Sequence, residues 1–426
     1  MLIEDIYRIF QNLNGLNTDS RTISINSLFI ALKGEKFNGN KFAKSAIKNG
    51  ARYAIIDDEK YKIDERFILV ENCLETLQKL ANFHRKKLNT KIIAITGSNG
   101  KTTTKELLYN VFKPSYSTIC TIGNLNNHIG VPLSLLSIKI DTEIAIIEMG
   151  ASSLGEIKLL CDIAEPNYGY ITNFGKAHIE GFGSESKVLQ GKSELYNYLR
   201  SNNGTIFFNL DDNKQKKLLK NYDKKFSFGL KSKFCEYKLC SVNESIIINT
   251  ENENISSSLY GKYNVDNIMA AVCIGKYFKI SIKSISEGIS NYIPKNNRSE
   301  IIKKKSNTIL LDAYNANPSS MYASIKNFIK TNFKNKILIL GDMYELGDDE
   351  IKYHQEITDY CQSSNIKKII LIGKIFSNTN NSEKFIKYNN VNEFINSYDF
   401  DKLKKSTILV KGSRGEMLEK VIDYID

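Results

Sequence analysis

The sequence lacks the features of a membrane-spanning or secreted protein. No apolar run reaches the length needed to cross a bilayer, and residues 1–5, Met-Leu-Ile-Glu-Asp, lack the basic and apolar regions of a signal peptide. The seven cysteines are dispersed and form no C-x-x-C pair, which argues against a disulfide framework or a cysteine zinc site. We therefore expect a cytoplasmic protein with reduced thiols and no stable insertion into a membrane.

Other absences narrow the functional class. The net charge is +12, but the lysines are spread over the whole chain, and no basic stripe is interleaved with aromatic residues. Nucleic acid is therefore not an expected partner, and the charge suits small anions such as nucleotides and diphosphates. No strand-like run is followed by the G-x-G-x-x-G pattern of dinucleotide-binding folds, and no internal repeat is visible.

The chain is long enough for several cores. It has 426 residues, of which 42% are hydrophobic, and this exceeds one ordinary domain. Three α/β units are predicted: a small one over 1–88, a central one over 89–295 and a C-terminal one over 296–426. The polar stretch 294–297, Pro-Lys-Asn-Asn, marks the second boundary.

Strand-like runs alternate with helical patterns in each unit. In the first unit, a helix over 73–87 follows the last strand. In the central unit, this alternation predicts a mainly parallel, doubly wound sheet, with a more irregular stretch over 225–258 as an antiparallel addition to that sheet. The C-terminal unit is predicted to be Rossmann-like. The predicted strands lie at 27–32, 51–57, 67–70, 92–96, 143–148, 168–172, 205–209, 308–312, 336–341, 368–373 and 407–411.

The most informative stretch is Thr-Gly-Ser-Asn-Gly-Lys-Thr-Thr at 96–103, between an apolar strand and an amphipathic helix. The amides of such a loop bind phosphate, Lys101 would reach the β- and γ-phosphates, and the Thr102 hydroxyl would bind Mg²⁺. This is shorter than the common phosphate loop, which would need glycine where Ile95 stands. The alternative is a chance glycine turn before a helix. The predicted ATP-binding loop residues are Gly97, Ser98, Asn99, Gly100, Lys101, Thr102 and Thr103.

Three residues that follow central strands or lie on the next helix are candidates for metal chemistry. Glu148 closes the run 144–148, where a carboxylate beside a phosphate loop suits Mg²⁺, although a surface salt bridge is the alternative. His178 is one of only four histidines, and its chemistry fits a structural role equally well. Lys192 is by itself typical of a surface lysine. The amide-rich loop 123–132 suits a sugar or a pyrophosphate, and equally a turn.

These stretches together resemble the Mur ligase family, the ATP-dependent amide ligases of peptidoglycan precursor synthesis. The loop at 96–103 matches the family's phosphate loop. The stretches 123–132, 312–321, 340–347 and 410–415 resemble the member that joins D-alanyl-D-alanine to a UDP-N-acetylmuramoyl tripeptide. The resemblance covers all three units. It implies that the tripeptide carboxylate and ATP form an acyl phosphate, which the amine of the dipeptide then attacks.

The resemblance also implies roles that the residue chemistry leaves open. Glu148 and His178 would hold two Mg²⁺ ions, and Lys192 would be carbamylated to support the second ion, which requires a neutral amine. Removal of Lys101 would cost several orders of magnitude in rate. The predicted ATP contacts outside the loop are Asn264, Asn267, Arg298 and Asp312, with Asp312 toward the ribose. The predicted substrate contacts are Ser20, Arg21, Asn40, Asn124, Asn126, Asn127, Asn315, Asn317, Lys411 and Arg414.

The family resemblance gives each unit a task. The first unit would bind the UDP sugar, the second ATP and the third the dipeptide, in a monomer whose C-terminal unit moves to close the site. One departure stands at 38–40, where Asn-Gly-Asn replaces the Asp-Gly-His of many relatives. The third residue of the tripeptide, lysine or meso-diaminopimelate, is not specified by any residue considered.

Two other functions remain as alternatives. One is a sister ligase with another acceptor, either the tripeptide-forming enzyme or a folylpolyglutamate synthase; the stretches 315–318 and 123–127 argue against these. The other is a nucleotide-dependent switch or motor. A switch would hydrolyse ATP without substrate and would not need His178 or Lys192.

Overall fold

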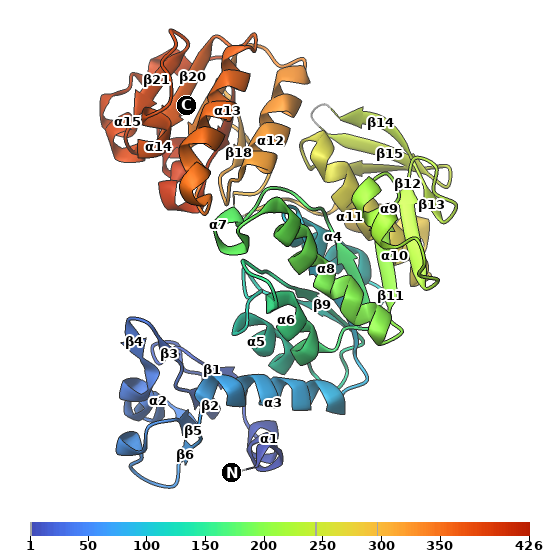
Figure 1. The fold of residues 1–426 in the computed structure, drawn as a ribbon, viewed down its shortest axis with the longest axis vertical. Coiled ribbons are helices and arrows are strands. Elements are labelled where there is room, and N and C mark those ends of the chain that lie inside the picture. Colours follow the sequence, from blue (N-terminus) through green and yellow to red (C-terminus); the bar gives the residue numbers. More distant parts are fainter. Residues whose placement is uncertain (1, 243–244, 296) are drawn as a thin grey trace.

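The computed structural model describes residues 2–242, 245–295 and 297–426. The molecule is elongated, with the first region (2–88) at one end, the C-terminal region (297–426) at the other and the central region (89–295) between them (Figure 1). The predicted three-part α/β fold is confirmed, because each region contains its own main sheet. The exact division stays a prediction, and residue 296, at the second boundary, lies outside the described residues. None of the described helices has the length and apolar character to span a bilayer.

The first region contains a four-stranded parallel sheet in the order β1-β2-β5-β6. Strands β2, β5 and β6 consist largely of buried residues, and they coincide with the apolar runs from which strands were predicted. The elements are α1 (Ile3–Gln11), β1 (Leu16–Asn17), β2 (Ser27–Ile30), β3 (Lys33–Gly34), β4 (Phe37–Asn38), η1 (Gly39–Phe42), α2 (Ala43–Lys48), β5 (Ala51–Ile56), η2 (Glu59–Tyr61) and β6 (Phe67–Leu69).

Helix α3 (Cys73–Lys87) connects the first region to the central one (Figure 1). It begins at Asn72, whose side chain accepts a hydrogen bond from the amide of Glu75, an N-cap that satisfies a free helix donor. Its buried apolar residues belong to a hydrophobic core that continues without a break from the first region to the central helices α5 (Gly130–Leu136) and α6 (Glu156–Ala164). The first two regions are therefore packed as one body.

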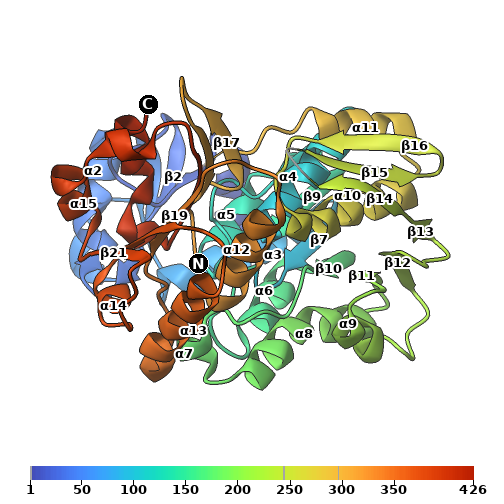
Figure 2. The same ribbon diagram turned by 90° about the horizontal axis from the view of Figure 1, so that it is seen from above.

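The central region is built on a seven-stranded sheet of exclusively parallel pairs, in the order β13-β12-β11-β10-β7-β9-β8. Successive residues of a strand face opposite sides, so Ile92 and Ala94 pack on one core and Ile93 and Ile95 on another. Helices therefore cover both faces (Figure 2), as the doubly wound prediction requires. The elements are β7 (Lys91–Thr96), α4 (Lys101–Phe112), β8 (Thr118–Cys120), β9 (Ile144–Glu148), β10 (Tyr168–Ile171), α7 (Ile179–Phe182), α8 (Glu185–Ser201), β11 (Thr205–Asn209), α9 (Asn213–Leu218), β12 (Lys225–Gly229), β13 (Cys235–Glu236), η3 (Lys262–Asn264), α10 (Val265–Tyr277) and α11 (Ile282–Ser290).

The stretch 225–258 differs from its prediction. Strands β12 and β13 extend the main sheet in parallel, and α9 provides the crossover between β11 and β12. The antiparallel strands β14 (Lys238–Val242), β15 (Ile246–Thr250) and β16 (Glu253–Ser257) form a separate three-stranded sheet instead of adding to the main one. Glu251 and Asn252, both with positive φ, form the tight turn between β15 and β16 that makes these strands antiparallel.

The C-terminal region contains a six-stranded sheet in the order β17-β18-β22-β19-β20-β21, parallel except for the edge strand β17. Its four predicted strands are confirmed, and β17 and β21 are additional. The elements are β17 (Glu300–Lys303), β18 (Thr308–Asp312), α12 (Pro318–Lys330), β19 (Lys336–Gly341), η4 (Gly347–Asp349), α13 (Glu350–Gln362), β20 (Lys368–Ile372), α14 (Lys374–Ser377), β21 (Phe385–Tyr388), α15 (Val391–Ser397), η5 (Phe400–Leu403), β22 (Thr407–Lys411), η6 (Arg414–Glu416) and η7 (Leu418–Tyr424).

Candidate functional site

A cavity of about 1200 Å³ lies where the central and C-terminal regions meet. On one side, the cavity lies at the carboxyl ends of β7, β9 and β10, and on the other side at the carboxyl ends of β18 and β22. Parallel sheets bind ligands at this edge. Within the described residues, its lining begins at Ser98 and ends at Lys411, so the first region does not contribute. The cavity is therefore a two-sided site between separate sheets.

The loop after β7 has the geometry of a phosphate loop. Gly97 and Gly100 have φ of 136° and 82°, values that favour glycine. A Cβ on Gly97 would lie 2.0 Å from Thr172 Oγ1, and one on Gly100 would lie 2.4 Å from Asn267 Oδ1. The two predicted glycines are thus required both by the backbone and by the neighbouring side chains, and the alternative of a chance turn is not supported.

The strand end after β10 holds this loop in place. Thr172 Oγ1 donates to the carbonyl of Asn99 over 2.6 Å, and the amide of Asn99 donates to Asn173 Oδ1 over 3.1 Å. Ser98 Oγ donates to the carbonyl of Gly175 over 2.9 Å. Asn173 also lines the cavity, and the sequence analysis did not select it, although it stands directly after a predicted strand.

Lys101 is the first residue of α4 and lies against the loop. Its ammonium donates to the carbonyl of Gly97 over 2.7 Å, and burial lowers the pKa of Lys101 from its usual value. The helix N-terminus adds positive potential at the same place. Thr102 and Thr103, both buried, also line the cavity. This corner of the cavity is therefore suited to an anionic group.

Glu148 ends β9, beside Ile95 of β7 in the sheet register. Its side chain is 1% exposed, which excludes the alternative of a surface salt bridge. Asn126 Nδ2 donates to Oε1 over 2.8 Å, but Oε2 is buried without a hydrogen-bond partner among the described residues. An unsatisfied buried carboxylate oxygen is costly, and a hard cation such as Mg²⁺ would satisfy it. The residue therefore fits a metal ligand.

Lys192 is fully buried in α8, so the alternative of a surface lysine is wrong. Its ammonium donates to the carbonyl of Ala151 over 2.7 Å and lies 5.1 Å from the centre of the Phe182 ring. Burial, with a smaller contribution from Lys101, holds the pKa of Lys192 well below its usual value. Lys192 does not line the cavity and lies behind Ala151, which does. A neutral amine at this place is chemically able to take up CO₂.

His178 precedes α7 and lines the cavity. Its Nδ1 forms a close contact with the carboxylate of Glu345, from the turn after β19 in the C-terminal region. No group of three or more His, Cys, Asp or Glu side chains in the described parts of the chain is arranged to hold a metal. Glu148 and His178 would therefore need further oxygen ligands from a nucleotide or water to complete a Mg²⁺ site.

The asparagines predicted to bind ligands also have structural roles. Asn127 Oδ1 accepts from the amides of Ile129 and Gly130, at the start of α5. Asn267 Nδ2 donates to Asn264 Oδ1 over 2.8 Å, and Asn267 Oδ1 accepts from Thr104 in α4. This last pair therefore supports the helix that follows the phosphate loop, while both residues also line the cavity.

The C-terminal region contributes charged groups to the other wall. Lys411 Nζ lies 2.6 Å from Asp312 Oδ2, on the neighbouring strands β22 and β18. The guanidinium of Arg298 stacks over the Tyr314 ring at 3.5 Å from its centre, and that of Arg414 lies 5.2 Å from the same ring centre. Tyr314 was not selected from the sequence, although it belongs to the stretch 312–321.

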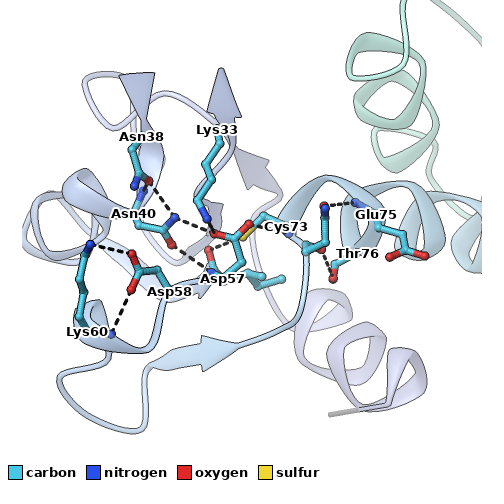
Figure 3. Close-up of polar contacts among 11 residues, drawn as sticks. Lys33, Asn38, Asn40, Asp57, Asp58, Lys60, Cys73, Glu75 and Thr76 are labelled. Atoms are coloured by element: carbon cyan, nitrogen blue, oxygen red, sulfur yellow. Dashed lines mark hydrogen bonds and ion pairs between the residues drawn. The ribbon is translucent and has the colours of Figure 1, made fainter. Parts of the chain in front are cut away.

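The predicted contacts of the first region lie away from this cavity. Asn40 Nδ2 donates to Asp57 Oδ1 over 2.7 Å, and Asn40 Oδ1 accepts from the amide of Asp57 over 3.0 Å (Figure 3). Lys33 pairs with the same carboxylate, which also accepts from the amide of Cys73 at the start of α3. Asn40 is buried and fully engaged, so its side chain ties this loop to α3. Its contact with UDP stays a prediction.

The cavity therefore brings together most of the predicted site. The predicted residues that line it are Ser98, Asn99, Gly100, Lys101, Thr102, Thr103, Asn124, Asn126, Asn127, Glu148, His178, Asn264, Asn267, Arg298, Asp312, Asn315 and Lys411. The predicted residues that do not line it are Ser20, Arg21, Asn40, Gly97, Lys192, Asn317 and Arg414.

Comparison with family models agrees with this geometry. Residues 95–275 match the Mur ligase middle domain, residues 297–414 the Mur ligase glutamate ligase domain, and residues 12–85 the Mur ligase family catalytic domain. A relative from Buchnera aphidicola is 38% identical over 96% of this chain and 93% of its own length. A three-region protein with a phosphate loop facing a C-terminal sheet is typical of this class, and the chain belongs to the Mur ligase family.

The relatives have more specific names. The Buchnera relative is named UDP-N-acetylmuramoyl-tripeptide–D-alanyl-D-alanine ligase. The crystal structure of MurF from Acinetobacter baumannii is similar to this chain with a TM-score of 0.87 and 26% identity, over 99% of this chain and 98% of that chain. MurF ligase from Thermotoga maritima, solved in complex with ADP, is similar with a TM-score of 0.83 and 27% identity, over 96% of each chain.

Proposed function

We propose that this protein is an ATP-dependent ligase that joins D-alanyl-D-alanine to a UDP-N-acetylmuramoyl tripeptide, a step of peptidoglycan precursor synthesis. The observation that carries the proposal is the two-sided cavity, in which the phosphate loop with Lys101 faces charged groups of the C-terminal sheet. The names of full-length relatives supply the substrates. Those names also argue against the sister ligases and the nucleotide switch as alternatives.

The reaction needs no protein nucleophile. The terminal carboxylate of the tripeptide attacks the γ-phosphorus of ATP, and an acyl phosphate and ADP result. The amine of the dipeptide then attacks the acyl carbon, loses a proton, and phosphate leaves. Lys101 and the amides of the loop would neutralise the charge on the phosphoryl oxygens, and the cavity walls would hold the reactants in line.

Mg²⁺ is the metal that the residues fit. Glu148, with its unpartnered oxygen, and His178 would hold it together with the Thr102 hydroxyl. The metal supplies charge neutralisation on the phosphates. We further propose two ions and a carbamate on Lys192, whose buried amine supports this modification. The adenosine end would lie near Asn264 and Asn267, with Arg298 and Asp312 facing the nucleotide.

The three regions would divide the substrates. The first region would bind the UDP moiety through Ser20, Arg21 and its neighbours, and the C-terminal region the dipeptide. The substrates are soluble metabolites, and we propose that the protein acts on them as a cytoplasmic monomer.

The test is phosphate release from ATP by the purified protein, measured with the UDP-N-acetylmuramoyl tripeptide and with or without D-alanyl-D-alanine. The proposal requires release that depends on both substrates, and a pentapeptide product by mass spectrometry. Release with another amino acid as acceptor would indicate a sister ligase. Release that ignores both substrates would contradict the proposal. Paired lysine-containing and diaminopimelate-containing tripeptides would identify the third residue.

A further inference from the structure

The cavity extends to both sides of the phosphate loop. In the central sheet β7 lies between β9 and β10, so residues that follow β8 and β9 lie on one side of the loop and residues that follow β11 lie on the other. The side beyond β10 is lined by residues 211–214. The side beyond β9 is lined by side chains of the loop 124–128 and by Ser152, Glu156, Leu159 and Leu160. This second side is termed the α6 arm.

The α6 arm is the part of the cavity on the side of the first region. Helix α3, which leads from the first region, packs against α5 and α6 (Figure 1). Gln78 Nε2 of α3 donates to the carbonyl of His128 over 3.0 Å, and Asn82 Nδ2 donates to the carbonyl of Ile163 over 3.0 Å. On the proposed function, the substrate is bound by its nucleotide in the first region and reacts at the phosphate loop, so its peptide runs through this arm.

Glu156 supplies a carboxylate to the α6 arm. It is the first residue of α6 and is half-buried. Its Oε2 accepts from the amide of Ser152 over 2.7 Å and from that of Ser153 over 3.3 Å, and no hydrogen bond among the described residues ends on Oε1. Burial opposes ionisation, but the amides outweigh it, and the pKa of Glu156 lies below its usual value. One oxygen of an ionised carboxylate is thus left for a further donor.

Glu156 also lacks a cation as a direct partner. On the opposite wall, Asp312 pairs with Lys411 over 2.6 Å, whereas the described residues include no ion pair of Glu156. The charge of Lys192 acts on Glu156 in the unmodified protein, and the proposed carbamylation would replace that positive charge by a negative one. A half-buried carboxylate in this setting is stabilised by a cation that the substrate brings.

The peptide of the proposed function carries one cation in the right place. Its third residue is lysine or meso-diaminopimelate, and the side-chain ammonium is the only positive charge of such a peptide, because its other amino groups are acylated. This side chain and the reacting carboxylate are attached to the same carbon. When the carboxylate lies at the phosphate loop, the ammonium lies in the adjoining arm. Leu159 and Leu160 there offer apolar surface to the methylene groups that precede it.

We propose that Glu156 is a specificity-determining residue whose carboxylate accepts a hydrogen bond from the side-chain ammonium of the third residue of the tripeptide. The inference rests on the proposed function, which supplies the peptide. It adds a reason why the third residue is a diamino acid. The contact serves lysine and diaminopimelate alike, because both carry the ammonium, so it does not select between them.

Two tripeptides test the inference on the unaltered protein. One contains lysine as its third residue, and the other contains norleucine, which keeps the carbon chain but lacks the ammonium. With saturating ATP and D-alanyl-D-alanine, wild type should join both peptides with similar kcat. The KM of the norleucine peptide should be about tenfold higher, as expected for the loss of a charge-assisted hydrogen bond. Equal KM values for the two peptides would overturn the inference.

Glu156→Gln assigns the effect to this carboxylate. The variant keeps an oxygen for the amide of Ser152, and it should raise the KM of the lysine peptide about tenfold while leaving that of the norleucine peptide unchanged. A merely structural role would change both KM values alike, and that result would contradict the assignment. So would a variant that keeps the preference of wild type. Asp162→Asn removes an exposed carboxylate from the same helix, outside the cavity, and should match wild type.

Thermal unfolding shows whether the variant is folded at the assay temperature. If it is not, Glu156→Asp replaces it, because it keeps the charge at the start of α6 and withdraws the carboxylate by one methylene group. It should raise the KM of the lysine peptide alone. An equal rise for both peptides, or no rise, would contradict the role of Glu156.

The outcomes separate this inference from the proposed function. If wild type joins neither peptide to the dipeptide, the proposed function fails. If wild type joins both peptides with the same KM, or if the preference survives in the variants, only the role of Glu156 fails.

Discussion

Asn317 Nδ2 donates to Asn99 Oδ1 over 2.7 Å, which joins the C-terminal region directly to the phosphate loop. The same Asn317 caps α12, because its Oδ1 accepts from the amide of Ser320 over 2.9 Å and the Ser320 hydroxyl accepts from the Asn317 amide. One side chain thus starts a helix in one region and contacts a loop in another. Its two functions can be separated by substitution.

Substitution of Asn317 should distinguish the cap from the contact between regions. Asn317→Ala loses both, and the helix cap alone should cost about 1 kcal/mol of unfolding free energy. Asn317→Ser keeps a capping oxygen but is too short to reach Asn99, so it should keep stability while weakening ATP binding. Denaturant unfolding and nucleotide titration measure the two effects. Equal ATP affinity in Asn317→Ser and wild type would show that the contact does not matter for binding.

Lys101→Ala should reduce the rate of substrate-dependent phosphate release by about 10³-fold or more. The residue is the cation placed at the phosphate loop, and the loss of a major electrostatic contact has effects of this order. Lys187→Ala, on the exposed side of α8, is the control and should have wild-type rates. A loss below tenfold in Lys101→Ala would mean that the lysine does not contact the transferred phosphate.

Lys192→Met should stabilise the protein, and more so at low pH. Burial lowers the pKa of Lys192, so the folded state binds fewer protons than the unfolded state between the two pKa values. The cost of the buried charge is therefore complete below the folded pKa and disappears as the pH rises past the unfolded value of about 10.4. We expect a gain on the order of 1 kcal/mol in CO₂-free buffer near neutral pH, by denaturant unfolding.

The same variant tests the proposed carbamate. A ¹³C signal of a carbamate should appear in wild type equilibrated with ¹³C-bicarbonate, and it should be absent from Lys192→Met. Lys187→Met is the matched control for stability, because it removes an exposed lysine from the same helix. A stabilisation that does not change with pH would contradict the assigned charge cost.

Tyr314→Leu should weaken the contacts of both arginines that lie on its ring. Cation–π contacts of this kind contribute about 0.5–2 kcal/mol each, so ATP affinity and the KM for the dipeptide should each worsen about twofold to thirtyfold. Tyr314→Phe keeps the ring and should stay close to wild type. In Tyr314→Leu combined with Arg298→Ala, the losses in ATP affinity should be less than additive. Additive losses would mean that the ring does not hold Arg298.

Local patterns in the sequence were sufficient for the main strands and the phosphate loop. The strand 92–96 is recognisable from its buried apolar run, and the two glycines after it from the positive φ that the loop itself requires. The edge strand β17 and the small sheet β14-β15-β16 were harder to predict, because edge strands are short and only partly buried. Each of these strands pairs with its neighbour in the chain, and what no local pattern encodes is that β14, β15 and β16 form a sheet separate from the main one.

The remaining site residues depend on contacts between regions. Glu345 stands in a stretch that the sequence analysis singled out, but its contact with His178, 167 positions away along the chain, follows only from the fold. The burial of Lys192 was also unpredictable, since lysine is usually exposed and only the packing of α8 against the central sheet, α6 and α7 removes it from water. Sequence patterns identify which residues are unusual, and the fold determines which of them meet.

Helix α3 has a consequence for which substrates fit. Its 15 residues form a rod of about 22 Å, and its two ends are embedded in a core shared by the first and central regions. The separation between the first region and the phosphate loop is therefore fixed, whereas the C-terminal region meets the phosphate loop directly through Asn317 and Asn99. On the proposed function, α3 therefore sets the distance between the bound nucleotide end of the substrate and ATP. A peptide stem that is too short cannot present its carboxylate to ATP while its nucleotide end stays bound.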